Sequence, residues 1–62
     1  MNAAQRREVI LKRLSEADAP VSASVLAAQL GVSRQIVVGD VALLRAGGAA
    51  IEATPRGYQF HP

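Results

Sequence analysis

The sequence predicts a mainly α-helical fold that ends in a small β-hairpin, and three observations predict it. Apolar residues recur at helical spacing in three segments within residues 3–46. After Gly48 the pattern changes to alternating apolar and polar residues on both sides of the turn sequence TPRG (54–57). The chain has 62 residues and no cysteine, so packed aliphatic side chains must supply its stability without a disulfide.

The first predicted helix runs from Ala3 to about Glu16. Asn2 and Gln5 have the spacing of a capping box, in which each side chain bonds the other residue's backbone N–H. Pro20 disfavours helical backbone at the residue before it, so the helix must end earlier. The expected inward stripe consists of Ile10, Leu11, Leu14 and the aliphatic stem of Arg7.

A short second helix is predicted over residues 23–30. Ser22 is its expected N-cap, and Gly31 is the expected left-handed residue that ends it. The extended residues before it, 20–22, are expected to complete a small sheet with the hairpin. The residues expected to be buried are Val25, Leu26 and Leu30.

The third predicted helix runs from Arg34 to Ala46, with Ser33 as its N-cap and the pair Gly47-Gly48 as its end. Because only residues 31–33 join it to the second helix, the two helices must cross at a steep angle. That geometry is typical of a helix-turn-helix. The expected buried stripe is Val37, Val41 and Leu44.

The opposite face of the third helix is small and nearly uncharged. Gly39 lies in the middle of it and costs the helix about 1 kcal/mol relative to alanine. A helix stabilised by surface ion pairs would carry glutamate and lysine there instead. The residues of this face are Gln35, Gly39, Ala42 and Ala46, with Val38 beside them.

The hairpin is predicted over residues 50–60, with Ile51 and Ala53 on one face and Tyr58 and Phe60 alternating with Gln59. In its turn, Pro55 and Gly57 hold the second and fourth positions, as a type I turn prefers, and Arg56 lies at the tip. Three helices followed by such a hairpin, or wing, define the winged helix-turn-helix architecture. All residues, 1–62, are assigned to this one domain.

Two stretches carry a resemblance to a known family: PVSASVLAAQLGVSRQIVVGDVALLR (20–45) and IEATPRGYQF (51–60). They resemble the DNA-binding domain of the niacin-responsive transcriptional repressors and, more broadly, the amino-terminal winged helix of the biotin-repressor type. The most specific pieces are GVSRQ, DVALLR and ATPRGY. The resemblance implies sequence-specific binding of double-stranded DNA by a bacterial transcriptional repressor.

The resemblance also implies limits. Members of that family carry a carboxy-terminal domain with several histidines that binds metal and nicotinate, and this sequence lacks it. Nicotinate is therefore expected as a partner only of a longer protein with that effector domain. Gly39 departs from the family pattern, which more usually has a polar residue there.

The expected DNA interface combines the third helix (34–46) in a major groove with the wing (50–60) on the backbone or in a minor groove. At the start of the helix, phosphate can meet free backbone N–H groups, and long side chains can reach base edges. Small apolar side chains suit thymine methyl groups. The predicted contact residues are Ser33, Arg34, Gln35, Val38, Gly39, Ala42 and Arg56.

The other charged residues are assigned structural or solvent-exposed positions. We expect Arg6 and Arg7 to lie on a solvated helix face. Asp40 falls toward the core side of its helix, so it is expected to pair with a basic residue such as Arg45 or one on the first helix. His61 is assigned no role.

No enzyme, cofactor or metal site is expected. The chain has one histidine, no cysteine and no glycine-rich phosphate loop after a strand. No apolar run reaches the roughly 20 residues of a membrane span, and no signal peptide is apparent, so a cytoplasmic protein without a membrane partner is expected. Net charge of +2 permits nucleic acid as a partner without requiring it.

Two alternatives remain open on the residues alone. A winged helix can serve as a protein–protein interaction module, and Ile36, Val38 and Leu43 extend apolar surface beyond the buried stripe of the third helix. The same residues could instead form a homodimer contact. The operator, the regulated genes and the oligomeric state do not follow from the sequence.

Overall fold

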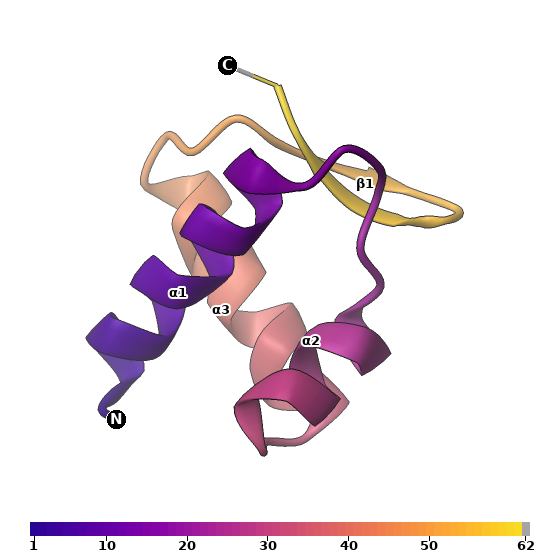
Figure 1. Ribbon diagram of the computed structural model, residues 1–62. Coiled ribbons are helices and arrows are strands. Elements are labelled where there is room, and N and C mark those ends of the chain that lie inside the picture. Colours follow the sequence, from indigo (N-terminus) through magenta and orange to yellow (C-terminus); the bar gives the residue numbers. More distant parts are fainter. Residues whose placement is uncertain (62) are drawn as a thin grey trace.

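The computed structural model describes residues 1–61 as three helices followed by a two-stranded antiparallel hairpin (Figure 1). The elements are α1 (Ala3–Glu16), α2 (Ala23–Leu30), α3 (Arg34–Ala46), β1 (Ile51–Thr54) and β2 (Gly57–Phe60). The predicted architecture of three helices and a wing is confirmed. The predicted domain boundary at Pro62 lies outside the described residues.

Local side-chain caps fix where the helices begin. The Asn2 side chain accepts the Gln5 N–H at 2.8 Å, and the Gln5 side chain accepts the Asn2 N–H at 2.9 Å, which completes the predicted capping box. The hydroxyls of Ser22 and Ser33 accept backbone N–H groups in the first turns of α2 and α3 at 3.1 and 3.2 Å. These contacts satisfy backbone donors that a helix start leaves unpaired.

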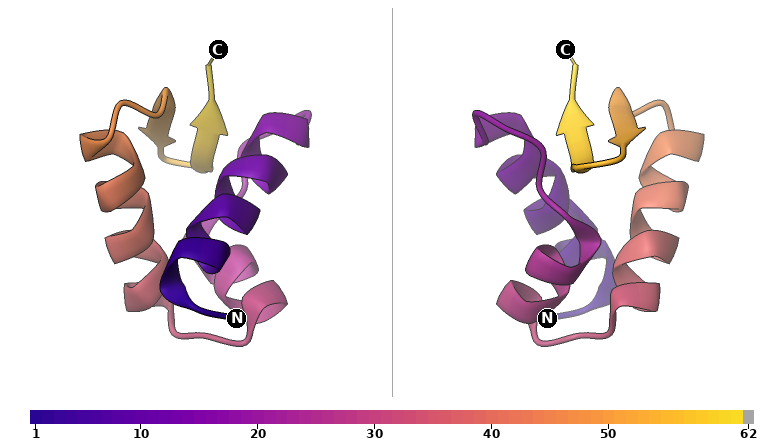
Figure 2. Two further views of the ribbon diagram at one scale, coloured as in Figure 1. Left: turned by 90° about the vertical axis from the view of Figure 1, so that its left-hand side faces the viewer. Right: turned by 90° about the vertical axis from the view of Figure 1, so that its right-hand side faces the viewer.

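The turn between α2 and α3 is short and steep. Gly31 adopts the left-handed conformation, with φ of 69°. Residues that carry a Cβ rarely adopt this conformation. The helix axes turn by 108° across the break, within the range typical of a helix-turn-helix. Figure 2 shows this connection at the end of the molecule opposite the hairpin.

One hydrophobic core joins all three helices to the wing. Ile10, Leu26, Val37 and Val41 are almost completely buried, and Ile51 of β1 closes the core from the side of the hairpin. Burial of such side chains stabilises a fold by about 1.5–3 kcal/mol each. The buried apolar residues are Ile10, Leu14, Ala23, Leu26, Ala27, Val37, Val41 and Ile51.

The predicted burial of Val25 is wrong, since 47% of this residue is exposed. The inward stripe of α2 instead includes Ala23, Leu26 and Ala27, with Leu30 packed at its edge. These four positions have the i, i+3, i+4, i+7 spacing of one helix face, and Val25 falls outside it. Small side chains on this face let α2 pack closely against its neighbours.

The two strands of the wing pair in register around a two-residue tip, with Pro55 and Gly57 at the turn positions predicted for them. Thr54 pairs with Gly57 across the tip, and Ile51 pairs with Phe60 at the base. Positive φ is absent from Pro55 and Arg56, which excludes turn types II, I′ and II′ and agrees with the predicted type I. The wing therefore ends in a short loop of two residues.

A third extended segment joins the wing, as predicted, through a single bridge. Val21 and Tyr58 exchange two backbone hydrogen bonds of 2.9 and 2.8 Å. Gly57 lies against this segment with φ of 136°, and a Cβ placed there would be 2.5 Å from the carbonyl carbon of Val21. Glycine is therefore required at this position by both the backbone conformation and the close approach.

Within residues 1–61, each helix taken singly is too short or too polar to cross a membrane. Only α2 and α3 taken together have the necessary length and composition, and they are bent sharply where they join.

Candidate nucleic-acid interface

The outer face of α3 is exposed along its length. The structure places six of the predicted contact residues on this helix or at its cap, all with exposed side chains or backbone: Ser33, Arg34, Gln35, Val38, Gly39 and Ala42. A Cβ added to Gly39 would meet nothing within 4 Å. The fold itself therefore gives no reason for glycine in the middle of this helix.

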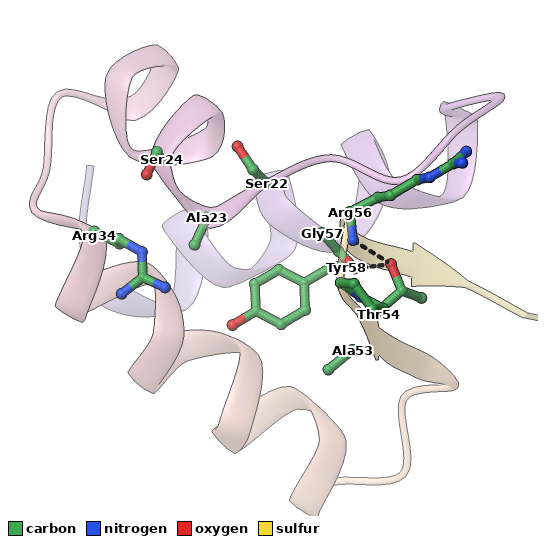
Figure 3. Close-up of a pocket in the computed structure, with 10 residues that line it drawn as sticks. Ser22, Ala23, Ser24, Arg34, Ala53, Thr54, Arg56, Gly57 and Tyr58 are labelled. Carbon is green, nitrogen blue, oxygen red and sulfur yellow. Dashed lines mark hydrogen bonds between the residues drawn. The ribbon is translucent and has the colours of Figure 1, made fainter.

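A groove separates the first turns of α2 and α3 from the wing (Figure 3). Its volume is about 300 Å³. The predicted contact residues Arg34 and Arg56 both line it, the first from α3 and the second from the wing tip. The lining residues are Ser22, Ala23, Ser24, Arg34, Ala53, Thr54, Pro55, Arg56, Gly57 and Tyr58.

The groove carries positive charge that the fold does not neutralise. Its lining includes two arginines and no acidic residue. Among residues 1–61, the acidic side chains that form ion pairs are Asp40 and Glu52, and neither pairs with Arg34 or Arg56. An anionic partner would therefore meet unpaired guanidinium groups here.

Asp40 is the buried charged residue of the described chain, and its partners lie on α1. Arg6 donates to it through Nε and, at 3.0 Å, through Nη2, while Arg7 Nη1 lies 3.5 Å away. The predicted pairing of Asp40 with the first helix is thus confirmed, and the Arg45 alternative is not. The hydrogen bonds from Arg6 lower the pKa of the Asp40 carboxyl, although burial opposes this effect.

The predicted solvated position of Arg6 and Arg7 is wrong. Only 19% and 29% of their side-chain surfaces are exposed, because both side chains fold onto α3 to reach Asp40. Hydrogen bonding to Asp40 raises the pKa of Arg6. These arginines belong to the α1–α3 contact and leave Arg34 and Arg56 as the basic residues of the groove.

Sequence reasoning did not identify Ser24, Thr54 and Tyr58 as residues of the candidate site. Thr54 holds the turn, since its hydroxyl donates to the Gly57 carbonyl at 2.7 Å and accepts the Arg56 N–H at 3.2 Å. Tyr58 extends its ring from the wing toward α3, with its hydroxyl on the side of Arg34 (Figure 3). The alternating pattern placed Tyr58 and Phe60 opposite Gln59 and gave no sign that the polar end of Tyr58 reaches the groove.

A steep pair of helices, an exposed second helix of that pair and an adjoining wing with basic residues define a winged helix-turn-helix protein. The profile of a family described as "HTH domain" matches residues 6–59. The chain belongs to this family.

The chain is also similar to named proteins. It is 48% identical over 54 residues to the probable transcription repressor NiaR of Thermotoga maritima, which covers 87% of this chain. It is 40% identical over 57 residues, or 92% of the chain, to the transcription repressor NadR of Bacillus subtilis. These matches confirm the resemblance to the repressor family drawn from the sequence. The chain spans 31% and 32% of the lengths of these two repressors.

A third similarity is to an enzyme subunit. The chain is 49% identical over 49 residues to the phenylalanine–tRNA ligase alpha subunit of Mus musculus. That match covers 79% of this chain and 10% of the ligase subunit. The similarity therefore concerns a small part of that protein.

Proposed function

We propose that the chain binds double-stranded DNA sequence-specifically, as the DNA-binding part of a bacterial transcriptional repressor. The observation that carries the proposal is the exposed outer face of α3 beside a groove with two arginines and no acidic lining residue. Membership in the helix-turn-helix family and the similarity to NiaR and NadR support it.

In the proposed complex, α3 lies in the major groove. Gln35 and Arg34, in its first turn, are within reach of base edges and phosphates, and the Ser33 cap lies where backbone N–H groups meet phosphate. Val38 and Ala42 contact thymine methyl groups, and Gly39 allows close approach of the helix backbone. Arg56 at the wing tip lies on the phosphate backbone or enters the minor groove.

Regulation by niacin is proposed only for a longer protein that carries an effector domain. Within residues 1–61, three or more metal-ligating side chains do not gather at any one place. We accordingly expect isothermal titration of the chain with nicotinate and a divalent metal to give no heat of binding. A stoichiometric heat would contradict this part of the proposal. A cytoplasmic location belongs to the same proposal.

The test is a fluorescence anisotropy titration against a labelled duplex at several salt concentrations. The logarithm of the affinity should fall linearly with the logarithm of the salt concentration. The slope of this line should be about −0.9 for each phosphate that the chain contacts. An RNA duplex of the same sequence is the matched control, chosen because one similar protein is a tRNA ligase subunit. The proposal would be overturned if the affinity for the DNA duplex did not fall with salt, or if the RNA duplex were bound equally well.

A single half-site should be bound weakly, because one copy offers few basic contacts. Two half-sites one helical turn apart, bound by chains fused to a dimerising segment, should raise the affinity by orders of magnitude through effective concentration. Nanomolar binding of one half-site by the unfused chain in physiological salt would contradict this expectation.

A second candidate function is a protein–protein interaction module. Ile36 and Leu43 on α3 are 41% and 59% exposed, and because they are seven residues apart they lie on the same side of the helix, where they offer a partner apolar surface. This candidate, and homodimerisation through the same residues, predicts binding without a steep dependence on salt. Sedimentation analysis of the chain with and without duplex separates these outcomes.

A further inference from the structure

Tyr58 is held in a fixed position with its hydroxyl unused. Its backbone exchanges two hydrogen bonds with Val21, and its ring is partly buried against the core. The side-chain hydrogen bonds formed among residues 1–61 include none to its hydroxyl. Figure 3 shows this hydroxyl directed toward α3 and Arg34. The residue is therefore a preorganised hydrogen-bond group that the fold does not need.

Three elements contribute polar groups to the lining of the groove. Arg34 comes from α3, Ser24 from α2 and Tyr58 from β2, and all three line the groove. The hydrogen bonds and ion pairs among residues 1–61 likewise leave the Ser24 hydroxyl and the Arg34 guanidinium without a partner. The Arg34 guanidinium is a charged donor and both hydroxyls can also donate, so an acceptor with negative charge suits all three groups together.

The groove is open to solvent beside the outer face of α3. Ser24 and Arg34 are exposed, and Arg34 belongs both to the first turn of α3 and to the groove. A polymer whose edge lies against α3 would therefore pass the mouth of the groove. A phosphodiester group has the negative charge and the acceptor oxygens that the three donors require.

We propose that the groove holds one phosphodiester group of the nucleic acid backbone, bound by the Tyr58 hydroxyl and the Arg34 guanidinium with Ser24 beside them. This inference rests on the proposed DNA-binding function and divides the roles within it. Arg34 fixes the position of the duplex without reading its sequence, and base reading in the first turn of α3 falls to Gln35.

The experiment compares Tyr58→Phe and Arg34→Gln with the unchanged chain on duplexes of several unrelated sequences. Tyr58→Phe removes only the hydroxyl, and we expect the affinity to fall about tenfold to a hundredfold on every duplex, the loss typical of a hydrogen bond to a charged group. Arg34→Gln should weaken binding uniformly and reduce the salt slope by about one. Gln35→Ala should instead change the ranking of the sequences.

Two controls keep the outcome clear. Lys12→Gln removes one positive charge from an exposed position of α1 that does not line the groove, and it should change the affinity far less than Arg34→Gln. Circular dichroism melts should show that Tyr58→Phe leaves folding intact. When Tyr58→Phe and Arg34→Gln are combined, the losses of affinity should be less than additive, because both groups bind one phosphate.

Failure of the proposed DNA-binding function and failure of the phosphate site give different results. If the unchanged chain binds no duplex, the proposed function itself fails. If it binds but Tyr58→Phe binds equally well, or Arg34→Gln loses affinity for one sequence only, the phosphate site is overturned. Titration with inorganic phosphate, followed by NMR shifts of groove amides, identifies a free anion as the alternative. Saturation by inorganic phosphate together with unchanged duplex binding of Tyr58→Phe would assign the groove to that anion.

Discussion

The arginines of the α1–α3 contact and those of the groove differ in how the fold treats their charge. Arg6 and Arg7 fold onto α3 and share the buried carboxylate of Asp40, whereas Arg34 and Arg56 line a groove without an acidic residue. The sequence has seven basic and five acidic residues and does not distinguish these groups by composition. The fold, more than the net charge, therefore decides which cations remain free to bind a partner.

The two regions should also differ in what they contribute to stability. Removing one member of a buried ion pair leaves the other charge buried without a partner, which lowers the free energy of unfolding. Exposed charges without a partner contribute little to folding. Substitutions at the α1–α3 contact should therefore lower the melting temperature, and substitutions in the groove should lower affinity for DNA.

The largest effect is expected from Gly57→Ala, which would disrupt the groove itself. The added Cβ would lie 2.5 Å from backbone of Val21 at a φ of 136°. We expect a loss of about 3 kcal/mol in the free energy of unfolding, because strain and a backbone clash add. Chemical denaturation measures it, and Gly39→Ala, which meets open space, is the matched control. An unchanged midpoint would mean that the wing does not pack on Val21 in solution.

The next effect is expected from Asp40→Asn, which tests the charged contact directly. Loss of the charge-assisted hydrogen bonds should cost about 2 kcal/mol and lower the melting temperature by roughly 10 °C. The net charge rises from +2 to +3 when one negative charge is removed, so affinity for duplex DNA should not fall. Glu16→Gln makes the same charge change at an exposed position. A variant as stable as the parent would assign the contact no structural role.

Acid should gradually remove the stabilisation that the Asp40 contact contributes. The pKa of Asp40 is lower in the folded chain than its ordinary value of about 4, so the folded state favours the ionised carboxylate. The stabilisation is complete above that ordinary value and is lost as pH falls through the lowered pKa. Melting temperatures of the parent and Asp40→Asn should therefore differ at neutral pH and converge in acid. If the two melting temperatures differed by the same amount down to the lowest pH, ionised Asp40 would not be the source of the stabilisation.

The smallest effect, and the one of opposite sign, is expected from Gly39→Ala. The substitution should stabilise the chain by roughly 0.5–1 kcal/mol, because alanine favours helix and the site is open. It should also weaken DNA binding, because a methyl group would obstruct close approach of α3. Higher stability with equal affinity would exclude deep insertion of the helix. Lower stability would contradict the helical geometry at this residue.

Features set by neighbouring residues could be predicted from the sequence. The caps at Asn2, Ser22 and Ser33 and the left-handed Gly31 depend on groups within a few positions, and all were predicted correctly. Helical spacing likewise predicted Val37 and Val41 in the core.

Features that depend on distant residues were predicted only in part. The Arg6–Asp40 pair joins positions 34 residues apart, and periodicity cannot show which side chain of α1 turns toward α3. The sequence predicted that residues 20–22 join the hairpin, but it did not show that the Val21–Tyr58 pairing places the Tyr58 side chain in the groove. The error at Val25 was different, since strict helical spacing already favoured Ala23 and Ala27.

The single bridge between Val21 and Tyr58 has a consequence for how far the wing can be lengthened. The bridge and Gly57 fix the base of the wing, while Pro55 and Arg56 at the tip are exposed and pair with no other strand. Exposed loop tips are the sites where chains tolerate inserted residues. A few residues added between Pro55 and Arg56 would extend the reach of the wing and leave the helices undisturbed. Designers could therefore alter the length of duplex covered by this small scaffold without redesigning its core.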